Sequence, residues 1–414
     1  MKLKKQDPQI ARLIDLEMRR QELSLEMIPS ENHCSPAVRE ALGSVMTDKY
    51  AEGYPGKRYY SGLKYYDILE NLCRERAKKL FAVPHVNVQP YSGSPANASI
   101  YLAVCDPGDT IMGMALPMGG HLTHGWKVNF SAKFFKSIQY GVDEETNLLD
   151  YNQIKKLAQE NKPKLIFVGA TAYPRVFDWK RLGEIADSVG AYLAADIAHI
   201  AGLVVGGVHP SPVPYVHIIS TTTHKTLRGP RGGIVMVTKK GMQKDPDLPQ
   251  KIDKAIFPGF QGGPHMHQIA AIAVCLKEAS TAPFRRYARQ IVKNAKALAV
   301  ALQRYGFNLV TGGTDNHLIL IDLRNKNISG SEAQVLLEEA GIMTNKNTIP
   351  FDPAPPLNPS GLRMGTPAVT TRGMKEREMR KIAGWINEVI SNPKSVKKVR
   401  REVKNFCKKF PLPK

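Results

Sequence analysis

Short apolar runs alternate with amphipathic segments through the first two thirds of the chain. The runs 165–169, 191–195 and 216–219 are almost wholly apolar, which is typical of strands covered on both faces. Apolar positions at helical spacing cover 66–81 and 178–189, and Asp178 is expected to cap the second of these helices. This alternation predicts an α/β fold with a mostly parallel sheet covered by helices. Right-handed crossovers then place the loops after the strands along one edge, where ligands bind in such folds.

The pattern changes beyond residue 282. A helical pattern over 284–305 leads to an apolar strand at 318–321 and to a second helix from Ser331, where Gln334 completes a capping box. This part is expected to form a smaller α+β domain at the C-terminal end. The chain has 414 residues, which exceeds the size at which one core usually stops growing and favours two domains.

The first 28 residues show a third pattern. Ile10, Leu13 and Ile14 recur among charged positions, which predicts an amphipathic helix. An arm of this kind before a large domain often packs on another subunit. We therefore divide the chain into an N-terminal helical arm (1–28), a large domain (29–282) and a small C-terminal domain (283–414).

Two ionisable residues follow buried runs of the predicted sheet. Asp196 closes the run 191–195, and Lys225 comes 29 positions later, after the next strand. Neighbouring parallel strands would bring both side chains to one edge. This pair suits pyridoxal 5′-phosphate, because a carboxylate keeps the pyridine nitrogen protonated while a lysine holds the aldehyde as a Schiff base. The alternative is that both residues end strands and face water, as most charged side chains do.

A serine- and glycine-containing turn precedes this pair. Ser92, Gly93 and Ser94 stand between a short apolar run and a helical pattern. Free backbone N–H groups and two hydroxyls at a helix N-terminus would favour an anion. Taken alone, the turn is better explained as an ordinary serine N-cap. In combination with Asp196 and Lys225, it predicts a cradle for the phosphate of the cofactor.

Several longer strings resemble the serine hydroxymethyltransferase family, in the family's order and across nearly the whole chain. They lie at 30–32, 50–60, 119–125, 222–225, 257–264, 312–317 and 363–367. The resemblance implies a pyridoxal-phosphate enzyme of fold type I that transfers the hydroxymethyl group of serine reversibly to a tetrahydrofolate-type carrier, giving glycine. It also implies a homodimer with active sites shared between subunits, or a tetramer.

The resemblance also assigns cofactor contacts. The counterpart of Asp196 in the family holds the pyridine nitrogen, that of His121 stacks on the ring, and those of Gly262 and Gly263 reach a phosphate across the dimer interface. The full set of implied cofactor-binding residues is Ser92, Gly93, Ser94, His121, Thr171, Asp196, His199, Lys225, Tyr50, Gly262 and Gly263. Thr171 stands where the family commonly has a serine, and it keeps a hydroxyl.

Catalytic and substrate contacts follow from the same resemblance. Glu52 is expected to handle proton transfer, and Arg363 to clamp the amino-acid carboxylate, a task that suits a planar guanidinium. The implied catalytic residues are Lys225, Glu52, His224 and Thr222. The implied substrate-binding residues are Ser30, Tyr60, Arg231 and Arg363. The implied folate-binding residues are Leu116, Gly120, His121, Leu122 and Asn347.

Two segments depart from the family's usual pattern, at 115–118 and at 355–357. Both border the inferred carrier site, whereas the residues expected around the cofactor are retained. A folate-independent aldolase for threonine or another 3-hydroxy amino acid on the same scaffold is therefore the alternative function. Measuring serine cleavage with and without a pterin carrier separates the two.

The chain is strongly basic. It has 58 lysines and arginines against 37 acidic residues, a formal net charge of +21, which attracts anions without conferring specificity. Much of the excess lies in 394–404, where Val396, Val399 and Val403 recur at helical spacing. A solvated helix face is therefore favoured over an RNA-binding surface. The complete set of catalytic candidates also argues against an RNA-binding protein on a retired enzyme scaffold, so no specific nucleic-acid partner is expected.

Composition limits the remaining classes. No apolar run approaches the ~20 residues that cross a bilayer, and no apolar leader follows the first lysines. The five cysteines are widely spaced and form no C-x-x-C pair, which argues against a disulfide framework and a zinc site. We therefore expect a cytoplasmic protein without membrane contact and without a bound metal.

Overall fold

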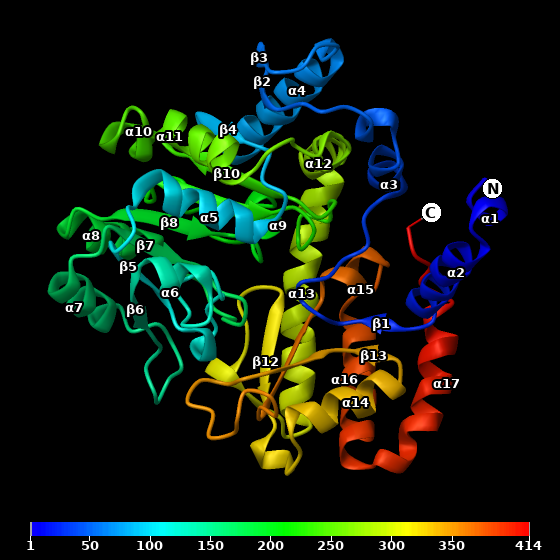
Figure 1. The fold of residues 1–414 in the computed structure, drawn as a ribbon. Coiled ribbons are helices and arrows are strands. Elements are labelled where there is room, and N and C mark those ends of the chain that lie inside the picture. Colours follow the sequence, from blue (N-terminus) through cyan, green and yellow to red (C-terminus); the bar gives the residue numbers. More distant parts are fainter. Residues whose placement is uncertain (1, 414) are drawn as a thin grey trace.

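The structure is a computed structural model that describes residues 2–413. A seven-stranded sheet lies at its centre, with the strand order β4-β10-β9-β8-β7-β5-β6 (Figure 1). Its strands are β4 (His85–Asn87), β5 (Thr110–Met114), β6 (Lys136–Tyr140), β7 (Leu165–Val168), β8 (Tyr192–Asp196), β9 (Ile218–Thr222) and β10 (Gly233–Val237). β5 to β9 pair in parallel, whereas β10 runs antiparallel to both β9 and β4. The prediction of a mostly parallel sheet is confirmed.

Both faces of this sheet are covered, which explains the continuous apolar runs. Along β7, Leu165 and Phe167 pack on one side with α5 and α11, while Ile166 and Val168 join the larger cluster on the other side. The helices are α3 (Pro36–Leu42), α4 (Lys64–Phe81), α5 (Gly93–Val104), α6 (Phe130–Phe134), α7 (Tyr151–Asn161), α8 (Trp179–Ser188), α9 (Ala201–Val205), α10 (Lys239–Lys244), α11 (Leu248–Lys254) and α12 (Met266–Ala279). This arrangement confirms the α/β fold.

The C-terminal part contains an antiparallel sheet in the order β11-β12-β15-β14. Its strands are β11 (Asn308–Leu309), β12 (Leu318–Asp322), β14 (Asn345–Asn347) and β15 (Gly361–Gly365). Its helices are α13 (Ala282–Arg304), α14 (Gly330–Glu339), α15 (Pro367–Thr371), α16 (Glu376–Ser391) and α17 (Val396–Cys407). The expected smaller α+β part is therefore present. Helix α13 joins the two cores, because Phe284 packs in the large one and Leu302 in the small one.

The N-terminal arm differs from the single helix that was expected. It forms α1 (Lys2–Gln6), α2 (Pro8–Glu22) and strand β1 (Leu25–Glu26), which pairs in parallel with β13 (Ile342–Met343). Asp7 caps α2 through a bond from the Ile10 N–H at 3.0 Å, so a new helix starts there. Leu25 is fully buried in the C-terminal core, whereas α2 buries none of its residues in this chain.

Local signals were correct at one helix start and wrong at another. Asp178 caps α8, as predicted, by accepting a bond from the Arg181 N–H at 3.0 Å. The predicted capping box at Ser331 and Gln334 is wrong, because α14 starts two residues earlier with Ser329 as its N-cap and Glu332 as the reciprocal partner. Strand β9 begins at residue 218, two residues later than predicted. No helix within residues 2–413 combines the length and apolarity needed to cross a membrane.

Candidate active site

A cavity of about 200 Å³ lies at the carboxyl ends of β8 and β9. It gathers residues from both sheets and from the segment after β1. The lining residues are Ser30, Gly93, His121, His124, Ala170, Thr171, Asp196, Ala198, His199, Thr222, Lys225 and Arg363. Nine of these belong to the predicted site; His124, Ala170 and Ala198 were not predicted. The cavity is where strand-end reasoning placed Asp196 and Lys225.

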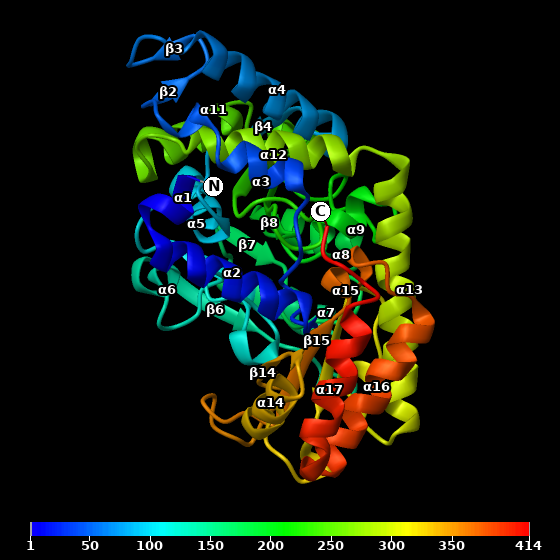
Figure 2. The same ribbon diagram turned by 90° about the vertical axis from the view of Figure 1, so that its right-hand side faces the viewer.

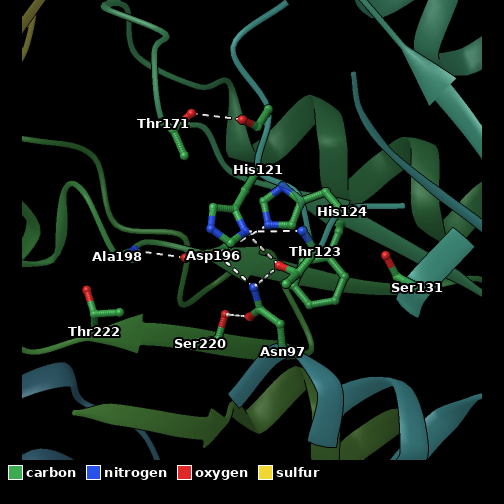
Figure 3. A network of polar contacts seen from close by, with 12 residues as sticks. Asn97, His121, Thr123, His124, Ser131, Thr171, Asp196, Ala198, Ser220 and Thr222 are labelled. Atoms are coloured by element: carbon green, nitrogen blue, oxygen red, sulfur yellow. Dashed lines mark hydrogen bonds and ion pairs between the residues drawn. The ribbon is translucent and has the colours of Figure 1, made fainter. Parts of the chain in front are cut away.

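Asp196 is held by a network of hydrogen-bond partners (Figure 3). Its carboxylate accepts bonds from Asn97 Nδ2 at 2.9 Å and from the Ala198 N–H at 3.0 Å, and it lies 3.2 Å from His124 Nε2. The Asn97 carbonyl oxygen in turn accepts a bond from Ser220 at 2.6 Å. Burial acts to raise the pKa of Asp196, but the contacts with His124 and Asn97 outweigh it and lower the pKa. The carboxylate is therefore anionic.

Lys225 lies just beyond the end of β9, and its amine faces the same cavity. Its Nζ donates to Thr222 Oγ1 at 3.1 Å. Burial lowers the pKa of Lys225 to about 8; the charge of Asp196 opposes this shift, and those of Arg231 and Arg363 add to it. An amine with such a pKa is partly neutral near pH 7.5 and can act as a nucleophile.

His121 is held in a defined orientation by Thr123. The Thr123 N–H donates to His121 Nδ1 at 3.2 Å, and the Thr123 hydroxyl lies 2.7 Å from the same nitrogen. Burial lowers the pKa of His121 to about 4, and the charge of His124 contributes, so the ring is neutral. Because Nδ1 accepts a hydrogen bond, the proton is expected on Nε2. A neutral aromatic ring in a fixed plane suits stacking.

The same neighbourhood offers ligand atoms for a metal ion in principle. One ligand atom from each of His121, His124 and Asp196 lies within 4.8 Å of the others. In this structure, however, His124 contacts Asp196, His121 contacts Thr123, and Asp196 also accepts a bond from Asn97. The absence of a bound metal in the protein stays a prediction.

Two further histidines lie near the lysine. His199 Nδ1 is 3.3 Å from His317 Nε2, and the two buried rings are stacked with centroids 5.5 Å apart. Burial lowers the pKa of both, that of His317 to about 3, so both rings are neutral. His224 does not line the cavity; burial and the charges of Lys225 and Arg231 lower its pKa to about 3.

The predicted phosphate turn forms the start of α5. Ser92 is its N-cap, yet the serine side chain makes no capping bond, and Ser94 is exposed. Gly93 lines the cavity, and a Cβ built on it would lie 2.8 Å from Thr222 Cγ2. Only glycine therefore leaves the Thr222 side chain undisturbed. The free N–H groups of this helix start remain available to an anion.

Arg363 reaches the cavity from the C-terminal sheet. It lies on β15, and its guanidinium donates to Asn345 Oδ1 at 3.1 Å and to the Thr171 carbonyl at 2.6 Å. Burial lowers the pKa of Arg363 to about 10, against the charge of Glu31. The group therefore remains a cation near neutrality. It shares the cavity with Ser30, which was predicted to contact the same substrate.

A second group of predicted residues lies together, but outside the cavity. The Tyr50 and Tyr60 rings are 5.2 Å apart. A Cβ on Gly263 would lie 3.0 Å from Tyr50 Cε1, and one on Gly262 would lie 3.3 Å from Glu52 Oε1. Tyr50 and Tyr60 are 61% and 46% exposed. We call these five residues the outer group.

A buried arginine holds the loop that carries Glu52. Arg58 donates to the Ala51 carbonyl at 2.7 Å and to the Gly53 carbonyl at 2.9 Å, which are the residues on either side of Glu52. The same guanidinium pairs with Glu70 of α4 at 2.7 Å. Arg58 therefore fixes the backbone around Glu52, a role that sequence reasoning missed.

The residues predicted to bind the carrier lie partly inside and partly outside the cavity. His121 lines the cavity, whereas Leu116, Gly120, Leu122 and Asn347 do not. Leu122 is 42% exposed, and Asn347 lies at the end of β14. The Thr171 hydroxyl donates to the Gly120 carbonyl at 2.8 Å, so it links this wall to the cavity. Arg231 is also outside the cavity and exposed, although its charge acts on Lys225.

Comparison with known protein families agrees with this geometry. The model of the family described as serine hydroxymethyltransferase matches residues 3–386 of the 414-residue chain. The match covers the arm, the large sheet, the cavity and most of the C-terminal part. Members of this family are pyridoxal-phosphate-dependent transferases that interconvert serine and glycine. The chain belongs to the serine hydroxymethyltransferase family.

Proposed function

We propose that this enzyme transfers the hydroxymethyl group of serine reversibly to a tetrahydrofolate-type carrier, with pyridoxal phosphate bound in the cavity between Asp196 and Lys225. The observation that carries the proposal is the convergence of a buried carboxylate and a buried amine of lowered pKa at the ends of β8 and β9. The same cavity contains Arg363, a cation suited to an amino-acid carboxylate.

The chemistry of the cavity fits this cofactor. An anionic Asp196 matches a protonated pyridine nitrogen, and the start of α5 at Gly93 matches a phosphate. The amine of Lys225 matches the aldehyde. We propose that Ser92 and Ser94 also hold the phosphate and that His121 stacks on the ring. Thr171 and His199 would lie toward the phenolic oxygen.

When bound, pyridoxal phosphate draws electrons from the α-carbon of the amino acid, so that a bond to that carbon can break. Arg363 and Ser30 would bind the carboxylate of serine and orient the side chain for cleavage. Glu52 would take the proton from the serine hydroxyl as the Cα–Cβ bond breaks, and return it in the reverse direction. Thr222 would hold the Lys225 amine in the position it has at 3.1 Å.

The outer group supports a two-chain active site. Glu52, Tyr50 and Tyr60 lie outside the cavity of their own chain, and both tyrosines are exposed. In a two-fold symmetric dimer, the same patch of each chain can complete the cavity of the other. We propose that Gly262 and Gly263 reach the phosphate in this way. The cytoplasmic location and the three-part division of the chain belong to the same proposal.

A visible absorption spectrum and a cleavage assay test this function together. The purified protein should absorb above 400 nm with pyridoxal phosphate, and Lys225→Ala should abolish that band. Conversion of serine to glycine should require a tetrahydrofolate-type carrier. Carrier-independent cleavage of threonine at a higher rate would favour the aldolase instead. A protein that binds no pyridoxal phosphate would overturn the proposal.

A further inference from the structure

Most of the net charge is concentrated in a small part of the chain. Helix α13 and the segment 375–409, which carries α16 and α17, hold eighteen lysines and arginines against four glutamates. These residues therefore contribute +14 of the formal +21 of the whole protein. The excess is far above what an even distribution would give, so it needs a structural explanation.

The fold brings these segments into one layer. α16 packs against both α13 and α17, and all three flank the C-terminal sheet on the same side (Figures 1 and 2). The apolar faces of α16, α17 and the second half of α13 share one core, with Leu298, Ile386 and Val403 among its buried residues. The opposite, polar faces consequently point to solvent. We call this surface the basic layer.

The acidic residues of the basic layer are only partly exposed, and each has a local partner. Glu376 accepts a bond from Gln290, Glu378 from the Lys375 N–H, and Glu402 from Trp385. Glu388 pairs with Lys398 at 2.8 Å. Across residues 2–413, Lys398 is the only lysine or arginine of the layer with a carboxylate within 4.0 Å. The remaining cations are thus available to an external anion.

The layer lacks the features of a membrane surface. A helix that binds in a bilayer interface needs an exposed apolar face beside its cations. Here the three valines of α17 are buried, and Val300 of α13 is the one exposed large apolar residue on the three helices within the described range. The layer therefore offers charge without an apolar wedge, which suits a partner with a dense row of negative charges.

We propose that the basic layer binds the phosphate backbone of nucleic acids without sequence preference. Regularly spaced phosphates match a broad cationic surface, and the release of their counterions supplies the free energy of binding. Exposed aromatic rings that could stack on bases do not occur along the described residues of α13, α16 and α17. The proposal replaces the sequence-based preference for a merely solvated helix face at 394–404, and it agrees with the expectation that no specific nucleic-acid partner exists.

Fluorescence anisotropy with a labelled 20-nucleotide oligouridylate, titrated with the full-length holoenzyme, tests the proposal. Between 50 and 300 mM NaCl, log Kobs should fall with log[NaCl] with a slope of about −3 or steeper, as expected for four or more phosphate contacts. Replacing Lys397, Arg401, Lys404 and Lys408 with Gln should weaken RNA binding at least ~10-fold. It should also make the slope of log Kobs against log[NaCl] less negative by about 3.

A matched control removes the same charge elsewhere. Lys133, Lys155, Lys156 and Lys180 are exposed on α6, α7 and α8, across the molecule from α17 (Figure 1). Their replacement with Gln should leave most of the affinity intact. Equal losses in the two variants would mean a diffuse effect of net charge and would overturn the proposal.

Two further outcomes would also overturn it. One is no RNA binding at 50 mM NaCl, and the other is binding to vesicles of four parts phosphatidylcholine and one part phosphatidylglycerol without binding to RNA. If the α17 variant does not fold, Arg289→Gln with Lys293→Gln and Lys296→Gln on α13 should weaken binding in its place. Serine–glycine interconversion should be unchanged in these variants, because none of the substituted residues lines the cavity.

Discussion

Two substitutions should move the pKa of Lys225 in opposite directions. Burial lowers the pKa of this amine to about 8, Asp196 opposes the shift, and Arg231 adds to it. Asp196→Asn removes the charge that favours the ammonium, so the pKa should fall further. Arg231→Gln removes a repelling charge from an exposed position, so the pKa should rise. A general loosening of the site could not produce both effects.

The magnitude follows from the fraction of neutral amine. At pH 7.5, a pKa of about 8 leaves roughly a quarter of the amine neutral, against about 0.1% at the ordinary value of 10.5. The buried amine is therefore ~200-fold richer in its reactive form. Removing the opposite charge of Asp196 should lower the midpoint by about one pH unit, and removing the more exposed charge of Arg231 should raise it by about 0.5.

Competitive labelling of the apoenzyme measures this directly. Trace acetic anhydride is added between pH 6 and pH 11, and modification of the Lys225 peptide is quantified by mass spectrometry against a free amine standard. The rate of pyridoxal phosphate capture, followed by visible absorbance, should give the same midpoint. Lys155→Gln, a distant loss of one exposed charge, serves as the control and should leave the midpoint unchanged.

Two results would refute this reasoning. A midpoint near 10 in the parent enzyme would mean that water reaches the amine and that burial does not control its charge. Midpoints that move in the same direction in Asp196→Asn and Arg231→Gln would mean that structural disturbance dominates over charge. Either result would remove the lowered pKa from the proposed chemistry while leaving the fold untouched.

Three other predictions follow from separate features. Arg58→Gln should lower the free energy of unfolding by about 3 kcal/mol in urea titrations, because it leaves the Glu70 carboxylate, which is 1% exposed, without its partner. A larger loss of stability in Arg58→Gln than in the double variant Arg58→Gln with Glu70→Gln would support this cause. An unchanged urea midpoint would contradict it. Gly93→Ala should weaken pyridoxal phosphate binding at least ~10-fold in equilibrium dialysis, since its Cβ would lie 2.8 Å from Thr222 Cγ2. Gly43→Ala is the control and should bind the cofactor as the parent does, because the nearest atom to its Cβ is 3.8 Å away. The apoenzyme should gain stability as the pH rises from about 8 to about 10.5, because over that range the unfolded chain keeps the Lys225 proton that the folded chain has lost. Thermal melts at each pH should show that Lys225→Met lacks the share of this gain in stability that comes from Lys225.

Strand-end reasoning located the centre of the site because it needs only local information. A buried run that ends in Asp196, and a second strand followed by Lys225, specify one edge of a parallel sheet whatever the rest of the chain does. The N-cap at Asp178 was predicted for the same reason, since its partner is three residues away. The capping box of α14 failed because two serines two residues apart offer competing starts, and Ser329 with Glu332 forms the better pair.

Pairings between residues far apart in the chain could not be predicted from the sequence. Strand β1 has two residues, too few for any period, and Leu25 finds its partner Ile342 at the other end of the chain. Asn97 bonds to Asp196 across 99 positions, and only its place among apolar residues of a buried helix face hinted that its amide needed a partner. The role of Arg58 in holding the loop around Glu52 could not be predicted either, because this arginine is one of several charged residues in that loop.

Asp196 and Lys225 are both buried charges of the cavity, yet they are not paired with each other. Among the described residues, the Asp196 carboxylate contacts Asn97, His124 and the Ala198 N–H, while the Lys225 amine donates a hydrogen bond to Thr222. Separate partners keep the carboxylate and the amine apart, at the free-energy cost that burial imposes on each charge. A direct ion pair would lower that cost but would close the space between them. In the function proposed above, the network around Asp196 would therefore keep that space open for the cofactor ring, with the pyridine nitrogen toward Asp196 and the aldehyde toward Lys225.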